Sequence, residues 1–442
     1  MKKLKDMVQA ILHDEQEHRL FSLKFERFPV WPYYRMYFYY TFMYEKGILD
    51  ISTSSVRFSW KYLWRLSDIF NIKKLLQKKE YFVLEHTRFN HYGEDIYTEE
   101  ICNYIGKEKC GFFSYSEKGS IGKGARVVYL DLLKIVSKIG SRIFYPFIMN
   151  SYFNKNFLDF LQALEVKDVH KYQKQYKRYY LELMVQYYFY RTLLKYKKTH
   201  TVILVVSYYN MPLVFAAKSL GIKVVEMQHG VISPYHLGYH FPFYEGEFFP
   251  DVLCLFSDHW KDAARYPSHT ELQVSGNSFM ATAKEHLVPP KKDKTILVIS
   301  QATIGEKLQA LILKNRENLK TYHIYFKLHP SEFGEIEKKY GVLQHMPNVT
   351  LVSTEHSIAE LQMHCTYQVG IYSTAIYEGI EKQCRTILLD ETGIEYMENL
   401  IEKGIAKVVT YEERLLDVMH QTEIPEKICF FEPFCLIKEE PL

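Results

Sequence analysis

Two short segments in the C-terminal part of the chain carry residues suited to binding a phosphate group. The first is the apolar run HIYFKLHP, which stops at His329 and Pro330 because proline cannot continue a strand's hydrogen-bond ladder. The second is YQVGIYSTAIYEGIEKQ, where Ser373 or Thr374 is expected to cap the helix that follows. Backbone N–H groups at a helix N-terminus attract anions. The two segments together predict a phosphate site at the strand ends of an open parallel sheet.

Polar residues also follow strand-like runs in the N-terminal half. The run KVVEMQHG brings Gln228, His229 and Gly230 to a strand end, where glycine permits a ligand to approach the backbone closely. The run YFVLEH leads into a polar loop, HTRFNHYGEDIYT, that contains Asp95. Taken singly, His229 could be a core histidine and Asp95 a helix cap. Their occurrence at successive strand ends favours a binding site.

Alternating strand-like and helical segments must position these residues. From Tyr81 onward, short apolar runs of strand length alternate with helical patterns, which is typical of parallel βαβ units. A break near Gly276, followed by Pro289, Pro290 and several lysines, divides the pattern into two blocks. The predicted fold class is therefore α/β, with two doubly wound Rossmann-like domains that face a cleft. The expected boundaries are 1–80 for a helical segment, 81–285 and 286–425 for the two domains, and 426–442 for a tail that packs back.

Composition limits the class of protein. The 442 residues carry a formal net charge of +4, which is too small and too dispersed to indicate nucleic-acid binding. The seven cysteines show no CxxC spacing, so reduced thiols are expected. The first apolar stretch ends at His13, which argues against a signal peptide, and no run approaches the roughly eighteen apolar residues of a membrane span. The expected location is the cytoplasm, either free or at the inner face of the membrane.

The segment 1–80 mixes aromatic and basic residues and has two interpretations. It could form an amphipathic surface at a lipid headgroup layer, where rings insert and cations meet anionic lipid. Alternatively, its aromatic faces could pack on the following domain. The residues proposed for membrane contact are Trp31, Tyr33, Tyr34, Arg35, Trp60, Trp64, Arg65, Lys73 and Lys74.

Over roughly Tyr81 to Asp390, the chain resembles the GT-B glycosyltransferases of bacterial capsule and lipopolysaccharide biosynthesis. Bacterial sialyltransferases, polysialyltransferases and capsule Kdo transferases share a His-Pro motif and a later Ser/Thr motif, which correspond here to His329-Pro330 and Ser373-Thr374. The tripeptide that begins at Gln228 is similar to one in capsule and lipopolysaccharide synthesis proteins and in polyol-phosphate polymerases. The resemblance implies a GT-B fold and transfer of a sugar from a nucleotide-activated donor, with a CMP-linked acidic sugar favoured, to a glycan or lipid-linked glycan acceptor.

The same resemblance implies roles for individual residues. His329 would hydrogen-bond or protonate the leaving phosphate, while Asp95, or else His229, would accept the proton of the acceptor hydroxyl. The related enzymes carry an acidic pair followed by glycine, whereas Gly93 precedes the pair here, so the base remains open. No metal site and no cofactor besides the nucleotide-sugar substrate are expected. The residues expected to contact the donor are Lys327, Pro330, Ser373, Thr374, Glu378, Gln228 and Gly230.

Three other functions stay open at this point. One is a CDP-polyol phosphotransferase of the teichoic-acid type, which would use a related nucleotide donor. Another is a nucleotide-sugar 2-epimerase. That family carries a sequence similar to Ser-Gly-Gly at the phosphate turn, whereas this chain has Ser373, Thr374 and Ala375. The last is a non-catalytic subunit of a polysaccharide-assembly complex, which would tolerate loss of His329.

Overall fold

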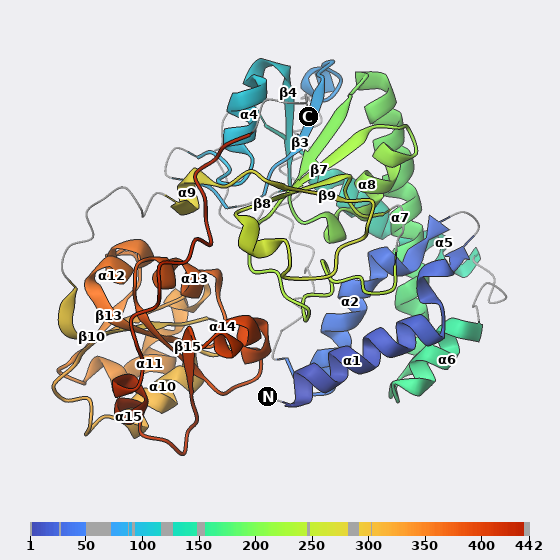
Figure 1. The fold of residues 1–442 in the computed structure, drawn as a ribbon. Coiled ribbons are helices and arrows are strands. Elements are labelled where there is room, and N and C mark those ends of the chain that lie inside the picture. Colours follow the sequence, from blue (N-terminus) through green and yellow to red (C-terminus); the bar gives the residue numbers. More distant parts are fainter. Residues whose placement is uncertain are drawn as a thin grey trace.

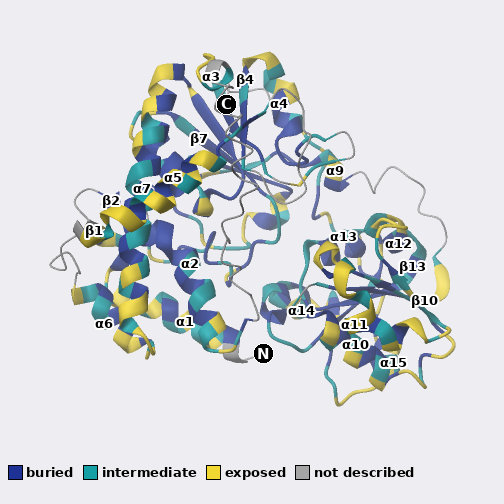
Figure 2. Ribbon diagram, turned by 180° about the vertical axis from the view of Figure 1, so that it is seen from behind, coloured by how far each residue is buried: buried dark blue, intermediate teal, exposed yellow. Residues whose placement is uncertain are grey.

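The computed structural model describes residues 2–436, apart from 26–27, 50–71, 87, 91–92, 116–126, 148–154, 245–247, 282–290 and 302. Two parallel sheets lie in successive parts of the chain, each covered by helices (Figure 1). Buried residues line the strands of both sheets, and the outer faces of the helices are exposed (Figure 2). The predicted fold class, two doubly wound α/β domains with a helical N-terminal segment, is confirmed.

The first sheet has seven described strands in the order β5-β4-β3-β6-β7-β8-β9, all parallel. Strands such as TVIL of β6 and VLCL of β8 are buried along their whole length because helices cover both faces of the sheet. The strands are β3 (Tyr81–Leu84), β4 (Cys110–Ser114), β5 (Val127–Tyr129), β6 (Thr201–Leu204), β7 (Lys223–Met227), β8 (Val252–Leu255) and β9 (Glu271–Val274).

The second sheet has six described strands in the order β12-β11-β10-β13-β14-β15, again all parallel. They are β10 (Lys292–Ile299), β11 (His323–Lys327), β12 (Val349–Val352), β13 (Cys365–Gly370), β14 (Arg385–Leu389) and β15 (Ala406–Val409). In both sheets the chain first builds outward on one side and then returns to the other side of the starting strand. The order therefore reverses between β3 and β6 and between β10 and β13, and ligands of doubly wound sheets bind outside the carboxyl ends at such points.

Helices connect and cover the strands. Those of the first part of the chain are α1 (Lys2–Glu17), α2 (Val30–Glu45), α3 (Ile72–Leu75), α4 (Glu99–Ile105), α5 (Asp131–Phe144), α6 (Lys155–Ala163), α7 (Val169–Lys197), α8 (Met211–Lys218) and α9 (Ser278–Ala281). Those of the second are α10 (Gly305–Lys314), α11 (Ile336–Gln344), α12 (Ile358–His364), α13 (Thr374–Glu381), α14 (Glu398–Glu402) and α15 (Leu415–His420). A short antiparallel pair, β1 (Lys24–Phe25) and β2 (Phe28–Pro29), precedes α2.

The aromatic residues of α2 are packing elements. Trp31, Tyr33, Tyr34 and Arg35 are all at most 4% exposed, so the prediction that they insert into a membrane is wrong. Their rings contact aromatic residues of α6 and α7, and Arg35 donates from Nε and Nη2 to the two carboxylate oxygens of Glu15 at 2.7 and 2.8 Å. A paired carboxylate is what allows an arginine to be buried. Trp60, Trp64, Arg65 and the side chain of Lys73 lie outside the described residues, Lys74 is half-buried, and no described helix is long and apolar enough to cross a membrane.

The described part of the C-terminal segment runs back to the first sheet. The amide of Asn277 donates to the carbonyl of Glu432 at 2.7 Å, and the amide of Glu432 donates to the carbonyl of Phe256 at 2.9 Å. The same segment also contacts the second domain, because the amide of Phe431 donates to Glu381 of α13 at 2.8 Å. Residues 430–435 therefore bond to both domains.

Candidate functional site

The predicted phosphate turn lies at the strand-order reversal of the second sheet. Ser373 caps α13, and its hydroxyl oxygen accepts from the amide of Ala375 at 3.2 Å, as the sequence predicted for one of the two hydroxyl residues. The amide of Ile376 already donates to the carbonyl of Ser373. What remains for an anion at this N-terminus is the amide and hydroxyl of Thr374, aided by the helix dipole.

His329 stands exposed at the end of β11, with Pro330 beginning the 3₁₀ helix Pro330–Glu335. Its backbone amide donates to the buried carboxylate of Glu332 at 2.8 Å, and its Nδ1 accepts from the amide of Ser331 at 3.3 Å. Because Nδ1 is the acceptor, the proton of the neutral ring is on Nε2. His329 therefore presents an N–H donor. One strand, β10, separates it from the Ser373 turn, which corresponds to about 10 Å between the two strands.

Lys327 is turned away from the Ser373 turn. Its ammonium group donates to the carbonyl oxygens of Ser353 and, at 2.8 Å, His356, which follow the edge strand β12. Burial lowers the pKa of Lys327, and the nearby Glu355 and Glu360 oppose that shift. In this arrangement Lys327 holds the loop after β12, which lies on the side of β11 away from the Ser373 turn.

The turn after β7 meets the turn after β13. Gln228 is buried and bridges its own turn, donating to the carbonyl of Gly230 at 2.9 Å and accepting from the amide of Phe256 at 2.9 Å. A Cβ atom on Gly230 would lie 3.4 Å from Oγ1 of Thr374. The structure thus brings the QHG tripeptide of the first domain against the N-terminus of α13, two predicted elements that are far apart in the sequence.

His229 forms the end of a buried hydrogen-bonded chain. Its Nδ1 lies 3.1 Å from the hydroxyl of Tyr239, and that hydroxyl donates to the carboxylate of Glu226 at 2.7 Å. An ionised Glu226 can only accept hydrogen bonds, so the hydroxyl of Tyr239 donates to this carboxylate and accepts from Nδ1–H of His229. The lone pair of the imidazole is then on Nε2. Burial raises the pKa of Glu226, with hydrogen bonds from Ser207 opposing the shift.

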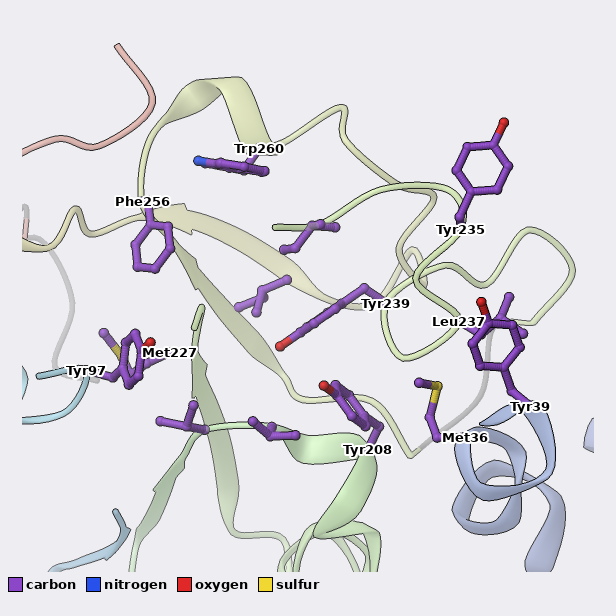
Figure 3. Packing of buried hydrophobic residues seen from close by; sticks show 14 of the residues in the cluster. Met36, Tyr39, Tyr97, Tyr208, Met227, Tyr235, Leu237, Tyr239, Phe256 and Trp260 are labelled. Atoms are coloured by element: carbon purple, nitrogen blue, oxygen red, sulfur yellow. The ribbon is translucent and has the colours of Figure 1, made fainter. Parts of the chain in front are cut away.

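The surroundings of His229 favour its neutral form. Burial lowers its pKa to about 3, and the neighbouring His236, His86 and Arg88 act in the same direction. The ring of His86 lies 6.0 Å from that of His229, and the ring of Tyr208 lies 6.3 Å away. Figure 3 shows Tyr208 and Tyr239 converging from the loops that follow β6 and β7. His229 is therefore an uncharged acceptor surrounded by aromatic and polar side chains.

Asp95 is fully buried and holds its own loop together. Its carboxylate accepts from the amides of His86 and Tyr97 at 2.9 and 3.1 Å and from the hydroxyl of Thr98 at 2.8 Å. Burial raises the pKa of Asp95 to about 7, against the effect of these three bonds. In this geometry both oxygens are engaged by the protein, so the carboxylate positions the loop that carries His86 and Arg88.

Glu378 lies one helical turn beyond Thr374 and faces the first domain. Burial lowers the pKa of Arg88, but Tyr97 and Glu378 outweigh this effect and raise it above its ordinary value. Arg88 also donates to the hydroxyl of Tyr97 at 3.2 Å. The charge of Glu378 thus acts on Arg88 of the first domain, beside the contact of Gly230 with Thr374.

A cavity of about 290 Å³ opens at the carboxyl edge of the second sheet. It is lined by Thr303 after β10, Tyr372 after β13 and Thr392 after β14, together with Lys307 and the end of α2. Its volume is close to the lower limit of small-ligand pockets, about 300 Å³. Within the described residues, no group of three or more His, Cys, Asp or Glu side chains is arranged to hold a metal ion.

Sequence reasoning missed Glu226 and Tyr239, and it placed Arg88 in the polar loop after the first strand without assigning it a role. A signal for Glu226 was present, because a charged residue inside the apolar strand KVVEMQ must find a partner when the strand is buried. Tyr239 gave no comparable signal, since it comes from a loop rich in tyrosine and phenylalanine.

The chain matches known proteins in structure but not in sequence. No protein-family model and no curated protein matches it. Among solved structures it is similar to UDP-GlcNAc 2-epimerase from Methanocaldococcus jannaschii, with 13% identity, 80% of this chain and 94% of that chain covered, and a TM-score of 0.46. MurG from Acinetobacter baumannii gives 11% identity, coverages of 78% and 89% and a TM-score of 0.41. The spinosyn rhamnosyltransferase SpnG gives 10% identity, with 77% of this chain and 91% of that chain covered and a TM-score of 0.45. Similarities of this size assign neither a family nor an activity to the chain.

Proposed function

We propose that this chain is a glycosyltransferase that moves a sugar from a nucleotide-activated donor to a hydroxyl group of a glycan acceptor. The observation that supports the proposal most directly is the approach of Gly230 to Thr374, because it puts a possible proton acceptor, His229, next to a phosphate-binding helix terminus. Transfer from a nucleotide sugar needs both of these functions close to one anomeric carbon.

The second domain would hold the donor and stabilise the leaving phosphate. Thr374 would donate its hydroxyl and amide protons to the phosphate, and Ser373 would keep α13 capped so that the dipole points at it. His329 would donate from Nε2 to the same phosphate as the bond between the anomeric carbon and the phosphate oxygen breaks. Pro330 fixes the turn that presents this ring, and Glu378 would reach a ribose hydroxyl.

The first domain would bind the acceptor. As the acceptor oxygen bonds to the anomeric carbon, its proton would pass to Nε2 of His229, and the charge on the imidazole would be offset through Tyr239 by the carboxylate of Glu226. The low pKa of His229 makes it a weak base in the free protein. A donor phosphate bound beside it would raise that pKa, since a nearby negative charge favours the protonated ring. Asp95, the first choice from the sequence, fits a positioning role better because its oxygens are enclosed.

The proposed identities of the donor and the acceptor rest on the His-Pro, Ser/Thr and QHG motifs of the sequence. A CMP-linked acidic sugar is the favoured donor, a surface glycan or lipid-linked glycan the favoured acceptor, and residues 81–285 and 286–425 would form the acceptor and donor domains. The reaction would need no metal or other cofactor and would take place in the cytoplasm or at the inner face of the membrane.

A thermal-shift screen with CMP, CDP, UDP and GDP tests the proposal. A nucleotide at a hundred times its dissociation constant stabilises the fold by about 2.7 kcal/mol, which is readily measured. We expect CMP to give the largest shift, and absence of any shift with all four nucleotides would overturn the proposal. Incubation of the matching donor with and without glycan acceptors then separates transfer from hydrolysis, while release of CMP from a CDP-polyol would indicate a phosphotransferase instead.

A further inference from the structure

A cavity of about 370 Å³ lies at the amino ends of β3 and β4, opposite to the strand ends that lead to His229 and Asp95. The four residues of β3 separate the two ends of the strand by roughly 13 Å. Helix α3, which contributes Lys74 to the lining, lies at the end of the first domain that points away from the second domain (Figure 2). The cavity is therefore separate from the proposed transfer site.

Lys197, the last residue of α7, is a buried cation beside this cavity. Its side chain is 1% exposed. Its Nζ lies 5.2 Å from the ring centroid of Phe113 and would lie 3.5 Å from a Cβ atom on Gly111, and both of these residues line the cavity. Its hydrogen bonds run to the carbonyl oxygens of Leu75, at 3.3 Å, and Gln77. These bonds use two of the three N–H groups of the ammonium.

The charge of Lys197 has no carboxylate partner among the residues that the structure describes. The other deeply buried cation, Arg35, forms an ion pair with Glu15. Burial lowers the pKa of Lys197 to about 8, and the neighbouring Lys79 acts in the same direction. Because a buried charge is costly unless it is paired, an anion from solution would be stabilised next to Lys197.

Further lysines line the cavity. Lys107 forms ion pairs with two glutamates, which offset its charge. The ammonium of Lys79 donates to the carbonyl oxygen of Glu108, the acidic residue of the lining. Lys74, Lys79 and Lys197 thus outnumber Glu108 around the cavity. Lysine is a compact point charge that suits phosphate oxygens.

We propose that this cavity is a binding site for a small organic phosphate, whose anionic group lies between Lys79 and Lys197. Two cations that face one anion favour a doubly charged phosphate monoester over a carboxylate. The volume is that of a pocket for a whole small molecule, not only for a phosphate ion. The remaining lining includes Phe112, Phe113 and Val128, which would contact an apolar part of the ligand.

Isothermal titration of the full chain with phenyl phosphate, inorganic phosphate and phenol tests the proposal. We expect phenyl phosphate to bind, inorganic phosphate to bind more weakly and phenol not to bind, because charge and apolar contact both contribute. Lys197→Met should weaken the binding of phenyl phosphate roughly tenfold, the effect of a lost hydrogen bond to a charged group. Lys79→Gln, at a less buried position, should weaken it about threefold. Gly111→Val should abolish binding, since its side chain would occupy the space beside Nζ of Lys197.

Lys177→Met is the matched control. Lys177 lies on the same helix, is 5% exposed and also has a pKa that burial lowers, but it stands about 30 Å from Lys197 along α7. This variant should bind phenyl phosphate as the unmodified chain does. The variant Ser373→Ala with Thr374→Ala should likewise keep the binding that Lys197→Met loses, because α13 belongs to the other domain.

Three results would overturn the proposal. The first is absence of phenyl phosphate binding by the folded unmodified chain, and the second is an equal loss in Lys197→Met and Lys177→Met. The third is loss of binding in the double variant of Ser373 and Thr374 while Lys197→Met keeps it, which would place the anion at α13. If Lys197→Met does not fold, unchanged binding in both Lys79→Gln and Gly111→Val would overturn the proposal instead.

Discussion

The hydroxyl oxygen of Thr374 lies 3.4 Å from the position that a Cβ atom on Gly230 would occupy, although the two residues belong to different domains. A glycine at this position lets the turn after β7 touch the first residue of α13. A methyl group at this position would just reach van der Waals contact with the hydroxyl. The contact connects the predicted acceptor side of the cleft with its predicted phosphate side.

Replacing Ser373 and Thr374 by alanine should weaken nucleotide binding by tenfold or more, because the hydroxyl donors are lost and the cap of α13 is removed. Isothermal titration with the nucleotide from the thermal screen measures the effect. Ser357→Ala is the matched control, since Ser357 caps α12 in the same way, with its side chain accepting from the amide of Glu360 at 3.2 Å. Equal affinities in all three proteins would contradict a phosphate site at α13.

His329→Ala should lower turnover by about a hundredfold while nucleotide affinity stays within tenfold, because the Nε2–H donor acts mainly on the charge that develops as the donor bond breaks. Steady-state rates and titrations on the same samples separate the two effects. His345→Ala, an exposed histidine after α11, serves as the control. Normal turnover in His329→Ala would make this residue structural.

Tyr239→Phe should lower turnover by tenfold or more without changing nucleotide affinity, because His229 loses the partner that keeps its lone pair on Nε2. Nitrogen NMR of labelled histidine rings would report the change of tautomer directly. Tyr187→Phe removes a comparable buried hydroxyl, which donates to Ser219 at 3.2 Å far from the turn. If both variants keep full activity and His229 keeps its tautomer, the proposed chain of hydrogen bonds has no catalytic role.

Asp95→Asn should change how stability depends on pH. Burial raises the pKa of Asp95 to about 7, so the native state holds a proton that the unfolded chain releases near pH 4. Stability from this group is present below about pH 4 and is lost as the pH rises through about 7. The free energy of unfolding should therefore be larger for the variant than for the unmodified chain at pH 8. At pH 5 this difference should disappear or change sign. A constant difference across this range would contradict the raised pKa, and abolished turnover in a stable variant would restore Asp95 as the base.

Gly276→Ala should destabilise the protein by several kcal/mol. Gly276 has a φ of +67°, and an added Cβ atom would lie 2.3 Å from the carbonyl oxygen of Pro433 in the returning C-terminal segment. Gly221 has a φ of +68° with nothing within 4 Å of its Cβ position, so Gly221→Ala isolates the cost of the backbone conformation, about 1–2 kcal/mol. Denaturant unfolding of the two variants should show the larger loss for Gly276→Ala. Equal losses of stability in the two variants would mean that the C-terminal segment moves to accommodate the added methyl group.

Most of the two sheets could be predicted from the sequence because fully buried parallel strands appear as continuous apolar runs. Strand β15 was missed, since Ala406–Val409 has only four residues and one of them is an exposed lysine. The role of the N-terminal aromatic residues was also open, because a dense aromatic segment suits either a membrane surface or a core. The buried ion pair of Arg35 with Glu15 shows that α2 belongs to the core, and this pair forms only in the tertiary fold.

The site was predictable only in part for a related reason. Strand ends and the Ser373 cap follow from local sequence, and the fold places the Ser373 turn at the strand-order reversal of the second sheet. Whether a carboxylate faces the cleft or its own backbone depends on loop conformation, so Asp95 could not be distinguished from an accessible base.

The polypeptide passes between the two domains twice, once between α9 and β10 and again after α15, and the second passage is bonded on both sides. Trp260 of the first domain donates to the carbonyl of Phe430 at 2.8 Å, and Glu381 of the second accepts from the next amide. Two further contacts join the parts of the chain away from this segment: Lys5 forms an ion pair with Glu398, and Nδ2 of Asn399 lies 3.2 Å from Nε2 of His259. Separating Gly230 from Thr374 by moving one domain away from the other would therefore require these contacts and the bonds of the C-terminal segment to break or rearrange together.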